Sequence, residues 1–168
     1  MNTNSFADMG RIFLVKVVLL IAGIVMGFFI LRLFLFPFAV SDDVMHPNFQ
    51  KGEKIFLLRF FTPKAGDVVL VESPHESGEL YLRRIVAQEG DTVEVQKGEI
   101  KINNSPVHFT WNFIRKDERL FPMDFSMRDY FPAIKLKRNE YFVLGDNLDR
   151  GMDSRFFGPV LKEQIKGK

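Results

Sequence analysis

An almost uninterrupted apolar run from Ile12 to Val40 is the feature that most limits how this chain can fold. Only Lys16 and Arg32 interrupt the run, and both lie near its ends, where a long basic side chain can reach the lipid headgroups. A helix of this length exceeds the hydrocarbon thickness of a bilayer, which is about 30 Å, and Pro37 is expected to end it. The run therefore predicts one transmembrane helix over residues 12–38.

The charges that flank this run predict its orientation. Arg11 comes before it and Lys16 lies near its start, whereas Asp42 and Asp43 follow it, so the positive-inside rule places the N-terminus in the cytoplasm. A cleaved secretory signal is the alternative, but the run is longer than the usual stretch of about 7 to 15 apolar residues, and no A-x-A-like site follows. We therefore expect a single-pass protein with residues 1–11 in the cytoplasm.

Composition narrows the classes of function. The net charge is only +2, and the 23 basic and 21 acidic residues are interspersed, so the chain lacks the basic stripe of a nucleic-acid binder. No cysteine is present, which excludes disulfides, thiolate metal sites and cysteine catalysis. The 3 histidines are widely separated. We expect no metal site and no nucleic-acid partner.

Beyond the apolar run, residues 39–168 are expected to form one mainly β domain outside the cytoplasm. Short runs rich in Val, Ile, Leu and Phe recur between Gly, Pro and Asn turn signals. Lys97-Gly98 separates two alternating runs and predicts a hairpin, and Asn103-Asn104 supplies a second turn. The expected strands are 54–60, 67–72, 81–87, 91–96 and 141–144.

Residues 109–134 depart from this pattern and read as an irregular aromatic and basic insertion. Aromatic rings beside basic residues suit the membrane interface, and Trp111, Phe113 and Phe121 are the candidates for such contacts. The alternative is that these rings fill the core or cover a sheet face. The sequence leaves both interpretations open.

Four sequence blocks, in order, resemble those of type I signal peptidases. Gly145-Asp146-Asn147 followed by Asp153-Ser154-Arg155 resembles the family signature G-D-N-x-x-x-S-x-D-S-R. The first of the others is Met45-His46-Pro47-Asn48-Phe49 followed by Gly52-Glu53, resembling S-M-x-P-T-L and G-D. The remaining two are residues 63–69, resembling P-x-R-G-D-V-V, and residues 81–91, resembling Y-x-K-R-x-x-x-x-x-G-D. The resemblance implies a signal-peptidase-like β-barrel or sandwich and a Ser/Lys endopeptidase that removes signal peptides from exported proteins, without metal or cofactor.

The chain departs from the family at the positions that the resemblance identifies as catalytic. The nucleophile position is Val44, which has no atom that can attack a carbonyl. The general-base position is Arg83, and a guanidinium keeps its proton even when buried. The supporting serine corresponds to Gly151, and an oxyanion-hole serine corresponds to Asp42, whose carboxylate would repel an oxyanion. We expect the serine–lysine chemistry to be absent.

The remaining signature residues are expected to hold the fold and a groove. Asp153 and Arg155 can form an ion pair, and Asp146-Asn147 can brace a turn. A groove that binds an extended peptide by strand addition can keep that binding after the chemistry is lost. The expected scaffold residues are Met45, Pro47, Arg84, Asp91, Gly145, Asp146, Asn147, Asp153, Ser154 and Arg155.

These observations favour a catalytically inactive signal peptidase homologue that acts as a peptide-binding, protein-binding or assembly subunit. One alternative is an active peptidase with displaced catalytic residues, for which Ser41, Ser126 and Ser154 are the candidate nucleophiles. Another is a purely structural component of a membrane complex. The expected partners are membrane lipid, an extended peptide or exported protein, and other subunits. The expected location is the bacterial cytoplasmic membrane, with the β domain outside.

Overall fold

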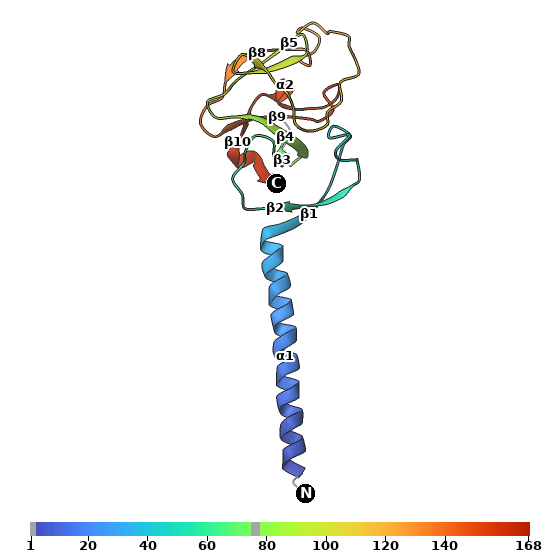
Figure 1. Ribbon diagram of the computed structural model, residues 1–168, viewed down its shortest axis with the longest axis vertical. Coiled ribbons are helices and arrows are strands. Elements are labelled where there is room, and N and C mark those ends of the chain that lie inside the picture. The colour runs from blue at the N-terminus through green and yellow to red at the C-terminus, as the bar shows by residue number, and fades with distance from the viewer. Residues whose placement is uncertain (1–2, 75–77) are drawn as a thin grey trace. The chain divides into compact units, whose positions relative to one another are not determined.

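The computed structural model describes residues 3–74 and 78–168 and separates into two compact units, Met1–Phe36 and Pro37–Lys168. The first unit is dominated by α1 (Thr3–Phe34), which ends before Pro37 (Figure 1). Within the described residues, α1 contains one stretch, Gly10–Phe34, that is long and apolar enough to cross a membrane.

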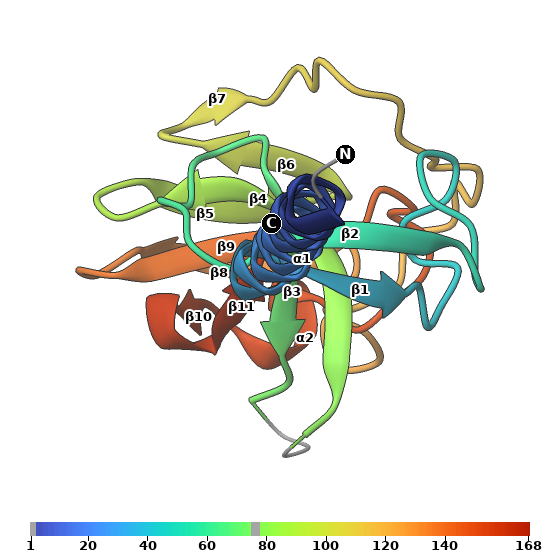
Figure 2. The ribbon, with the colours of Figure 1, turned by 90° about the horizontal axis from the view of Figure 1, so that it is seen from below.

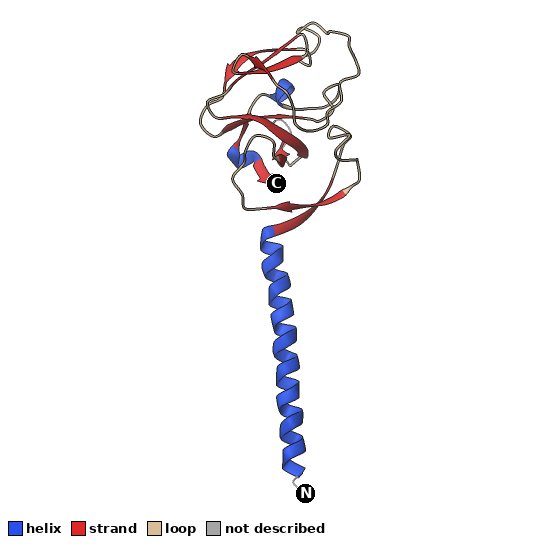
Figure 3. Cartoon of the chain, viewed as in Figure 1, coloured by secondary structure: helices blue, strands red, loops and turns tan. Residues whose placement is uncertain are grey.

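The second unit is mainly β, as the sequence predicted (Figure 3). Its larger sheet is antiparallel and has the strand order β10-β9-β4-β3-β11. The long central strand β4 pairs with β3 over its first half and with β9 over its second half. The strands are β3 (Val68–Glu72), β4 (Leu80–Gln88), β9 (Glu140–Leu144), β10 (Val160–Leu161) and β11 (Ile165–Gly167).

A second antiparallel sheet has the order β7-β6-β5-β8. Both predicted turns are confirmed: Lys97 and Gly98 have φ angles of +52° and +74°, and Asn103 and Asn104 have +54° and +65°. Positive φ at both central residues is the geometry that matches the twist of a tight hairpin. The strands are β5 (Thr92–Gln96), β6 (Glu99–Ile102), β7 (Ser105–Pro106) and β8 (Tyr130–Lys135), so the end of the aromatic segment joins this sheet.

The remaining elements are short. β1 (Leu35–Ala39) and β2 (Lys54–Leu58) form a two-stranded sheet. A single helical turn, α2 (Ser154–Phe157), follows the signature loop, and a 3-10 turn (Lys162–Gln164) joins β10 to β11. In the view of Figure 2, β6 and β7 lie on one side of β4 and β9, and β10 and α2 lie on the other.

The central strands of the larger sheet are buried on both faces, since β4 is buried continuously from Leu82 to Ala87 and β9 from Phe142 to Leu144. The buried run of β4 includes two charged residues, Arg83 and Arg84. One face packs against the second sheet, where Phe131 and Phe142 meet edge to face with ring centroids 5.2 Å apart. The other face carries Val69, Val71 and Val143. The described sheets keep open edges, so the barrel named as one alternative from the sequence is not what these strands form.

Candidate functional site

Val44 lies in the loop between β1 and β2, and its side chain fills a narrow space between two glycines. The residue is 7% exposed. Its amide donates a hydrogen bond to Asp42 Oδ1 at 3.1 Å, and its carbonyl oxygen accepts one from the Asn147 amide at 2.8 Å. A Cβ atom on Gly151 would overlap the Val44 isopropyl group, and one on Gly145 would meet the same side chain. Positions 44 and 151 therefore share one packed space.

Arg83, on β4, is 1% exposed, and its guanidinium is held from several sides. Nε donates to the Met152 carbonyl at 2.8 Å, and Nη1 donates to the Leu82 carbonyl at 2.6 Å. Nη1 and Nη2 also donate to the two carboxylate oxygens of Asp42, at 3.3 and 2.9 Å. The ring of Tyr81 lies 4.9 Å from the guanidinium carbon. This arrangement makes Arg83 a structural cation, because a guanidinium cannot accept a proton from a hydroxyl.

The sequence did not predict that these positions pair with one another. The positions are distant in the sequence, yet Asp42 bonds to Arg83, and Val44 packs on Gly151. The opposite charges at positions 42 and 83 were the one available signal for the first pair. The signal available for the Val44–Gly151 pair was side-chain volume. Valine at position 44 is larger than the serine that the family has there, and glycine at position 151 is smaller.

The three serines considered as displaced nucleophiles bond to the backbone. Ser41 is exposed, and its hydroxyl donates to the Leu80 carbonyl at 3.5 Å. The hydroxyl of Ser126 accepts from the Arg128 amide at 3.2 Å, and that of the fully buried Ser154 accepts from the Val143 amide at 2.9 Å. These contacts are typical of turn and capping hydroxyls.

Arg84 and Asp146 form a buried two-pronged ion pair beside the signature loop. Nε and Nη2 of Arg84 donate to the two Asp146 oxygens at 2.8 and 2.7 Å. The Asn48 amide donates to the same carboxylate at 2.8 Å, a contact that the sequence did not indicate. The Arg84 guanidinium also lies over the ring of Trp111, 4.7 Å from its centroid. Charge-assisted pairs of this geometry fix orientation strongly, so Arg84 positions the loop.

Asp153 and Arg155 form the ion pair expected from the signature. The Arg155 Nη2 and Nε atoms donate to the Asp153 carboxylate at 2.7 and 3.0 Å. The same carboxylate accepts from the Gly145 amide at 3.2 Å and caps α2 through the Arg155 amide. Arg155 Nη1 donates to the Leu148 carbonyl at 2.9 Å. One buried carboxylate thus connects the start of the signature loop to its end.

The other predicted scaffold residues serve nearby turns. Met45 is fully buried, and its carbonyl accepts from the Phe49 amide at 3.0 Å, while Pro47 is partly buried in the same loop. Asp91 lies elsewhere: its carboxylate accepts from the Gln88 amide at 3.0 Å and from the Asn103 side chain at 2.9 Å. Asp91 therefore holds the two ends of the hairpin and does not join the Val44 loop.

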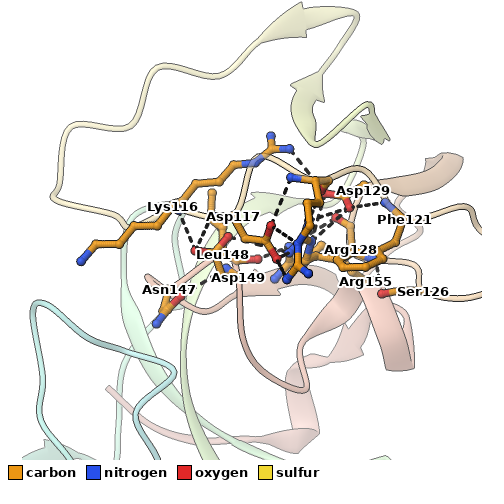
Figure 4. Close-up of polar contacts among 12 residues, drawn as sticks. Lys116, Asp117, Phe121, Ser126, Arg128, Asp129, Asn147, Leu148, Asp149 and Arg155 are labelled. Carbon is orange, nitrogen blue, oxygen red and sulfur yellow. Dashed lines mark hydrogen bonds and ion pairs between the residues drawn. The ribbon is translucent and has the colours of Figure 1, made fainter.

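The aromatic segment is tied to the signature loop by the charge network shown in Figure 4. Arg128 is 7% exposed and donates to the carboxylates of Asp117, at 3.1 Å, and Asp129, at 2.9 Å. Burial lowers the pKa of Arg128, but its hydrogen bonds to Asp129 and Asp117 outweigh this effect and raise the pKa overall. Asp149, in the signature loop, accepts from the Lys116 amide at 2.6 Å. Before β8 begins, the segment is therefore held by ion pairs and by hydrogen bonds to the signature loop.

Hydrogen bonds from Arg119 and Arg128 hold the pKa of Asp117 well below its usual value. The largest cause of the lowered pKa is the bidentate contact with the Arg119 side chain, whose Nε and Nη2 atoms each lie 2.8 Å from a carboxylate oxygen. Asp117 is consequently a carboxylate throughout the physiological pH range.

The three candidate interface aromatics have different environments. Trp111 packs on the core cluster and on Phe109, with ring centroids 4.8 Å apart. Phe121 is partly buried under the Arg128 guanidinium, 4.5 Å from the ring centroid. Phe113 is 46% exposed. The contacts of Trp111 and Phe121 favour the core-filling alternative, and Phe113 keeps a surface that can meet another molecule.

No group of three or more His, Cys, Asp or Glu side chains able to hold a metal ion occurs within residues 3–74 and 78–168. The carboxylates of Asp146 and Asp153 in the signature loop instead form ion pairs with Arg84 and Arg155.

Comparison with known proteins agrees with the motifs. Signal peptidase I T of Bacillus subtilis (strain 168) is 27% identical over 173 residues, covering 99% of this chain and 84% of that protein. Signal peptidase I S of the same strain is 31% identical over 144 residues, covering 82% of this chain and 77% of that protein. Thylakoidal processing peptidase 1 of Arabidopsis thaliana is 29% identical over 146 residues, 79% of this chain but only 40% of that protein.

A crystal structure of a signal peptidase I from Enterococcus faecalis V583 aligns with 64% of this chain and 96% of that one, with a TM-score of 0.48 and 24% sequence identity. The family model described as signal peptidase, peptidase S26, matches residues 11–168. A match over nearly the whole chain shows that this protein belongs to the signal peptidase family, peptidase S26.

Proposed function

We propose that this protein is a catalytically inactive member of the signal peptidase family that binds an exported or membrane protein, or assembles with other subunits, at the outer face of the bacterial cytoplasmic membrane. One observation carries the proposal. Where the family resemblance implies a nucleophile and a base, the chain has Val44 packed on Gly151 and Arg83 bonded to Asp42.

The size of the expected loss supports inactivity. Removing one oxyanion-hole donor costs roughly 3 to 4 kcal/mol of transition-state stabilisation, which leaves a slow enzyme. Removing the nucleophile and the base together removes the covalent mechanism. The Val44 side chain also occupies the space in which a side chain at position 151 would lie.

The anchoring part of the proposal rests on α1. Its Gly10–Phe34 stretch has the length and composition of a membrane span. Arg11 and Lys16 near its start favour a cytoplasmic N-terminus. The unit that begins at Pro37 would then act outside the cytoplasm.

The test is cleavage of a preprotein by the purified protein in lipid vesicles, with Bacillus subtilis signal peptidase I T as the positive control. We expect no product above the background of empty vesicles. Cleavage at the rate of the control would refute the proposal. If cleavage occurs, comparison with Ser41→Ala decides whether a displaced serine performs it, because Ser41 is the exposed candidate.

Restoring the family residues tests the same assignment from the other direction. One variant combines four changes and is compared with Val44→Ser alone. The four changes are Val44→Ser, Arg83→Lys, Gly151→Ser and Asp42→Ser. Because nucleophile and base act as a unit, the single change should give no cleavage. Full turnover by Val44→Ser alone would show that Arg83 does not occupy the base position.

A further inference from the structure

We infer that the Asp42–Arg83 ion pair closes the free edge of β4 to an extended peptide, and that a peptide can pair there only after this ion pair separates. The inference rests on the proposed function, since it concerns how a binding subunit would admit its ligand. The sequence analysis expected a groove that binds an extended peptide. We call the Asp42–Arg83 ion pair the latch, because it blocks the strand edge in that groove.

The first half of β4 has a strand on one side only. β3 pairs with β4 from Leu80 to Arg84. On the opposite side, β9 begins to pair only at Arg84, which faces Leu144, and continues toward Gln88. Residues 80–83 therefore present one edge that no described strand covers.

Backbone hydrogen bonds show which peptide groups point to that edge. The Ser73 amide donates to the Glu79 carbonyl at 2.8 Å, and the Ile85 amide donates to the Asp67 carbonyl at 2.9 Å. The odd-numbered residues of this stretch therefore bond toward β3. Because successive peptide groups in a strand point to opposite sides, those of Leu80 and Leu82 point to the uncovered edge.

Side chains of this chain already occupy both carbonyl oxygens on that edge. The Leu82 carbonyl accepts from Arg83 Nη1 at 2.6 Å, and the Leu80 carbonyl accepts from the Ser41 hydroxyl at 3.5 Å. Leu82 is only 1% exposed, so the edge is covered as well as capped. An added strand needs these two acceptors, because strand addition depends on main-chain hydrogen bonds.

Arg83 is the stronger of the two caps. Its guanidinium is also bonded to the Met152 carbonyl and to both oxygens of Asp42. Moving it away from Leu82 therefore disturbs contacts to two other segments. Asp42 is the accessible part of the latch, since its side chain is 28% exposed whereas that of Arg83 is 1% exposed. A lysine in place of Arg83 would lack the planar fork that reaches Asp42 and Leu82 together.

The experiment measures binding of a fluorescent peptide that spans the cleavage site of a preprotein, to the full chain in lipid vesicles. The test variant is Asp42→Ser combined with Arg83→Met, which removes both charges and keeps an unbranched side chain on β4. We expect at least a fivefold lower Kd than for the wild type. The matched control is Glu72→Ser combined with Lys166→Met, which removes an ion pair of 2.7 Å on the β3–β11 side of the same sheet. This control should bind like the wild type.

Hydrogen exchange shows whether the peptide binds at the proposed edge. With saturating peptide, the Leu80 and Leu82 amides should gain protection in the test variant. Equal peptide affinity in wild type and test variant, or a gain without protection at these amides, would overturn the latch and leave catalytic inactivity intact. Preprotein cleavage by the wild type would refute the proposed function instead.

If tryptophan fluorescence shows that the double variant is unfolded, Asp42→Asn replaces it. This change removes the counter-charge of Arg83 and keeps the size of the side chain, so the guanidinium is held less firmly over the Leu82 carbonyl. We then expect about a twofold lower Kd, and no change would overturn the inference.

Discussion

A Cβ atom placed on Gly151 would overlap the isopropyl group of Val44, and would lie 2.7 Å from its Cγ2 atom. Gly151 also has a φ of +108°, a region that residues with a side chain rarely adopt. The two positions are therefore complementary in volume, and the backbone at position 151 has a shape that favours glycine. Both features indicate that valine at position 44 and glycine at position 151 stabilise the folded site together.

Gly151→Ser should destabilise the protein by about 3 kcal/mol, since overpacking and an unfavourable φ each cost roughly 1 to 3 kcal/mol. Val44→Ala in the same chain should recover part of this loss, because it removes the overlapping methyl groups. A double-mutant cycle of urea unfolding measures the coupling, which we expect to be at least about 1 kcal/mol.

Gly158→Ser is the matched control for this cycle. Gly158 has a φ of +82°, but a Cβ there meets no atom within 4 Å. Its substitution therefore measures the backbone cost alone, and it should show no coupling to Val44→Ala. A coupling at Gly151 no larger than that at Gly158 would contradict the packing argument.

Features that depend on neighbouring residues were predictable from the sequence. The Lys97-Gly98 and Asn103-Asn104 turns follow from local backbone preferences, and the mainly β character follows from short apolar runs between turn residues. The Asp153–Arg155 ion pair joins residues two positions apart. Local chemistry is enough to specify each of these.

Contacts between distant segments were not predictable. Asp42 and Arg83 are 41 residues apart in the sequence and meet only because β4 passes beside the Val44 loop. The ion pairs of the aromatic segment were not predictable either, because Arg128 and Asp117 connect parts of a loop that has no periodic pattern. Without the strand register, one sequence cannot specify which charges pair.

Asp42→Ala should destabilise the protein by about 2 kcal/mol, because it leaves the buried Arg83 guanidinium without its counter-charge. The expected loss is below the 3 to 5 kcal/mol typical of a fully buried pair, roughly in proportion to the partial exposure of Asp42. Adding Arg83→Met should restore part of the free energy of unfolding. Lys166→Met, which breaks an exposed ion pair with Glu72, should change it by less than about 1 kcal/mol. If Asp42→Ala were equally mild, Arg83 would not depend on this carboxylate.

Arg84→Lys should destabilise the signature loop although the charge is kept. Lysine cannot reproduce the two parallel hydrogen bonds to Asp146 or the stacking on Trp111, so we expect a loss of about 2 kcal/mol. Trp111 is the single tryptophan, so all tryptophan emission comes from the ring on which Arg84 lies. The emission should shift to longer wavelength in Arg84→Lys and stay unchanged in Lys101→Arg, a partly exposed residue of β6. Identical emission in both variants would show that Arg84 does not shield the ring.

Acid should weaken the network that orders the aromatic segment. The pKa of Asp117 in the folded protein lies below its ordinary value of 3.8, first because of the Arg119 side chain and then through Arg128. A depressed carboxyl pKa adds stability that is fully present above the unfolded pKa and is lost as the pH falls through the folded one. The free energy of unfolding should therefore keep this contribution at neutral pH and lose it progressively below a pH of 3.8.

Asp117→Asn isolates this contribution. The variant should be less stable than the wild type at neutral pH, and the difference should shrink as the pH falls below 3.8, since the wild-type carboxylate then gains a proton. Urea unfolding at a series of pH values measures both curves. Glu118→Gln at the next position makes the same change in net charge but leaves the Asp117 contacts with Arg119 and Arg128 in place, so it should not lower the free energy of unfolding at neutral pH as Asp117→Asn does. Parallel curves for Asp117→Asn and wild type would show that the Asp117 contacts with Arg119 and Arg128 do not contribute to folding, and the ordering of the segment would then rest on Asp129 and Asp149.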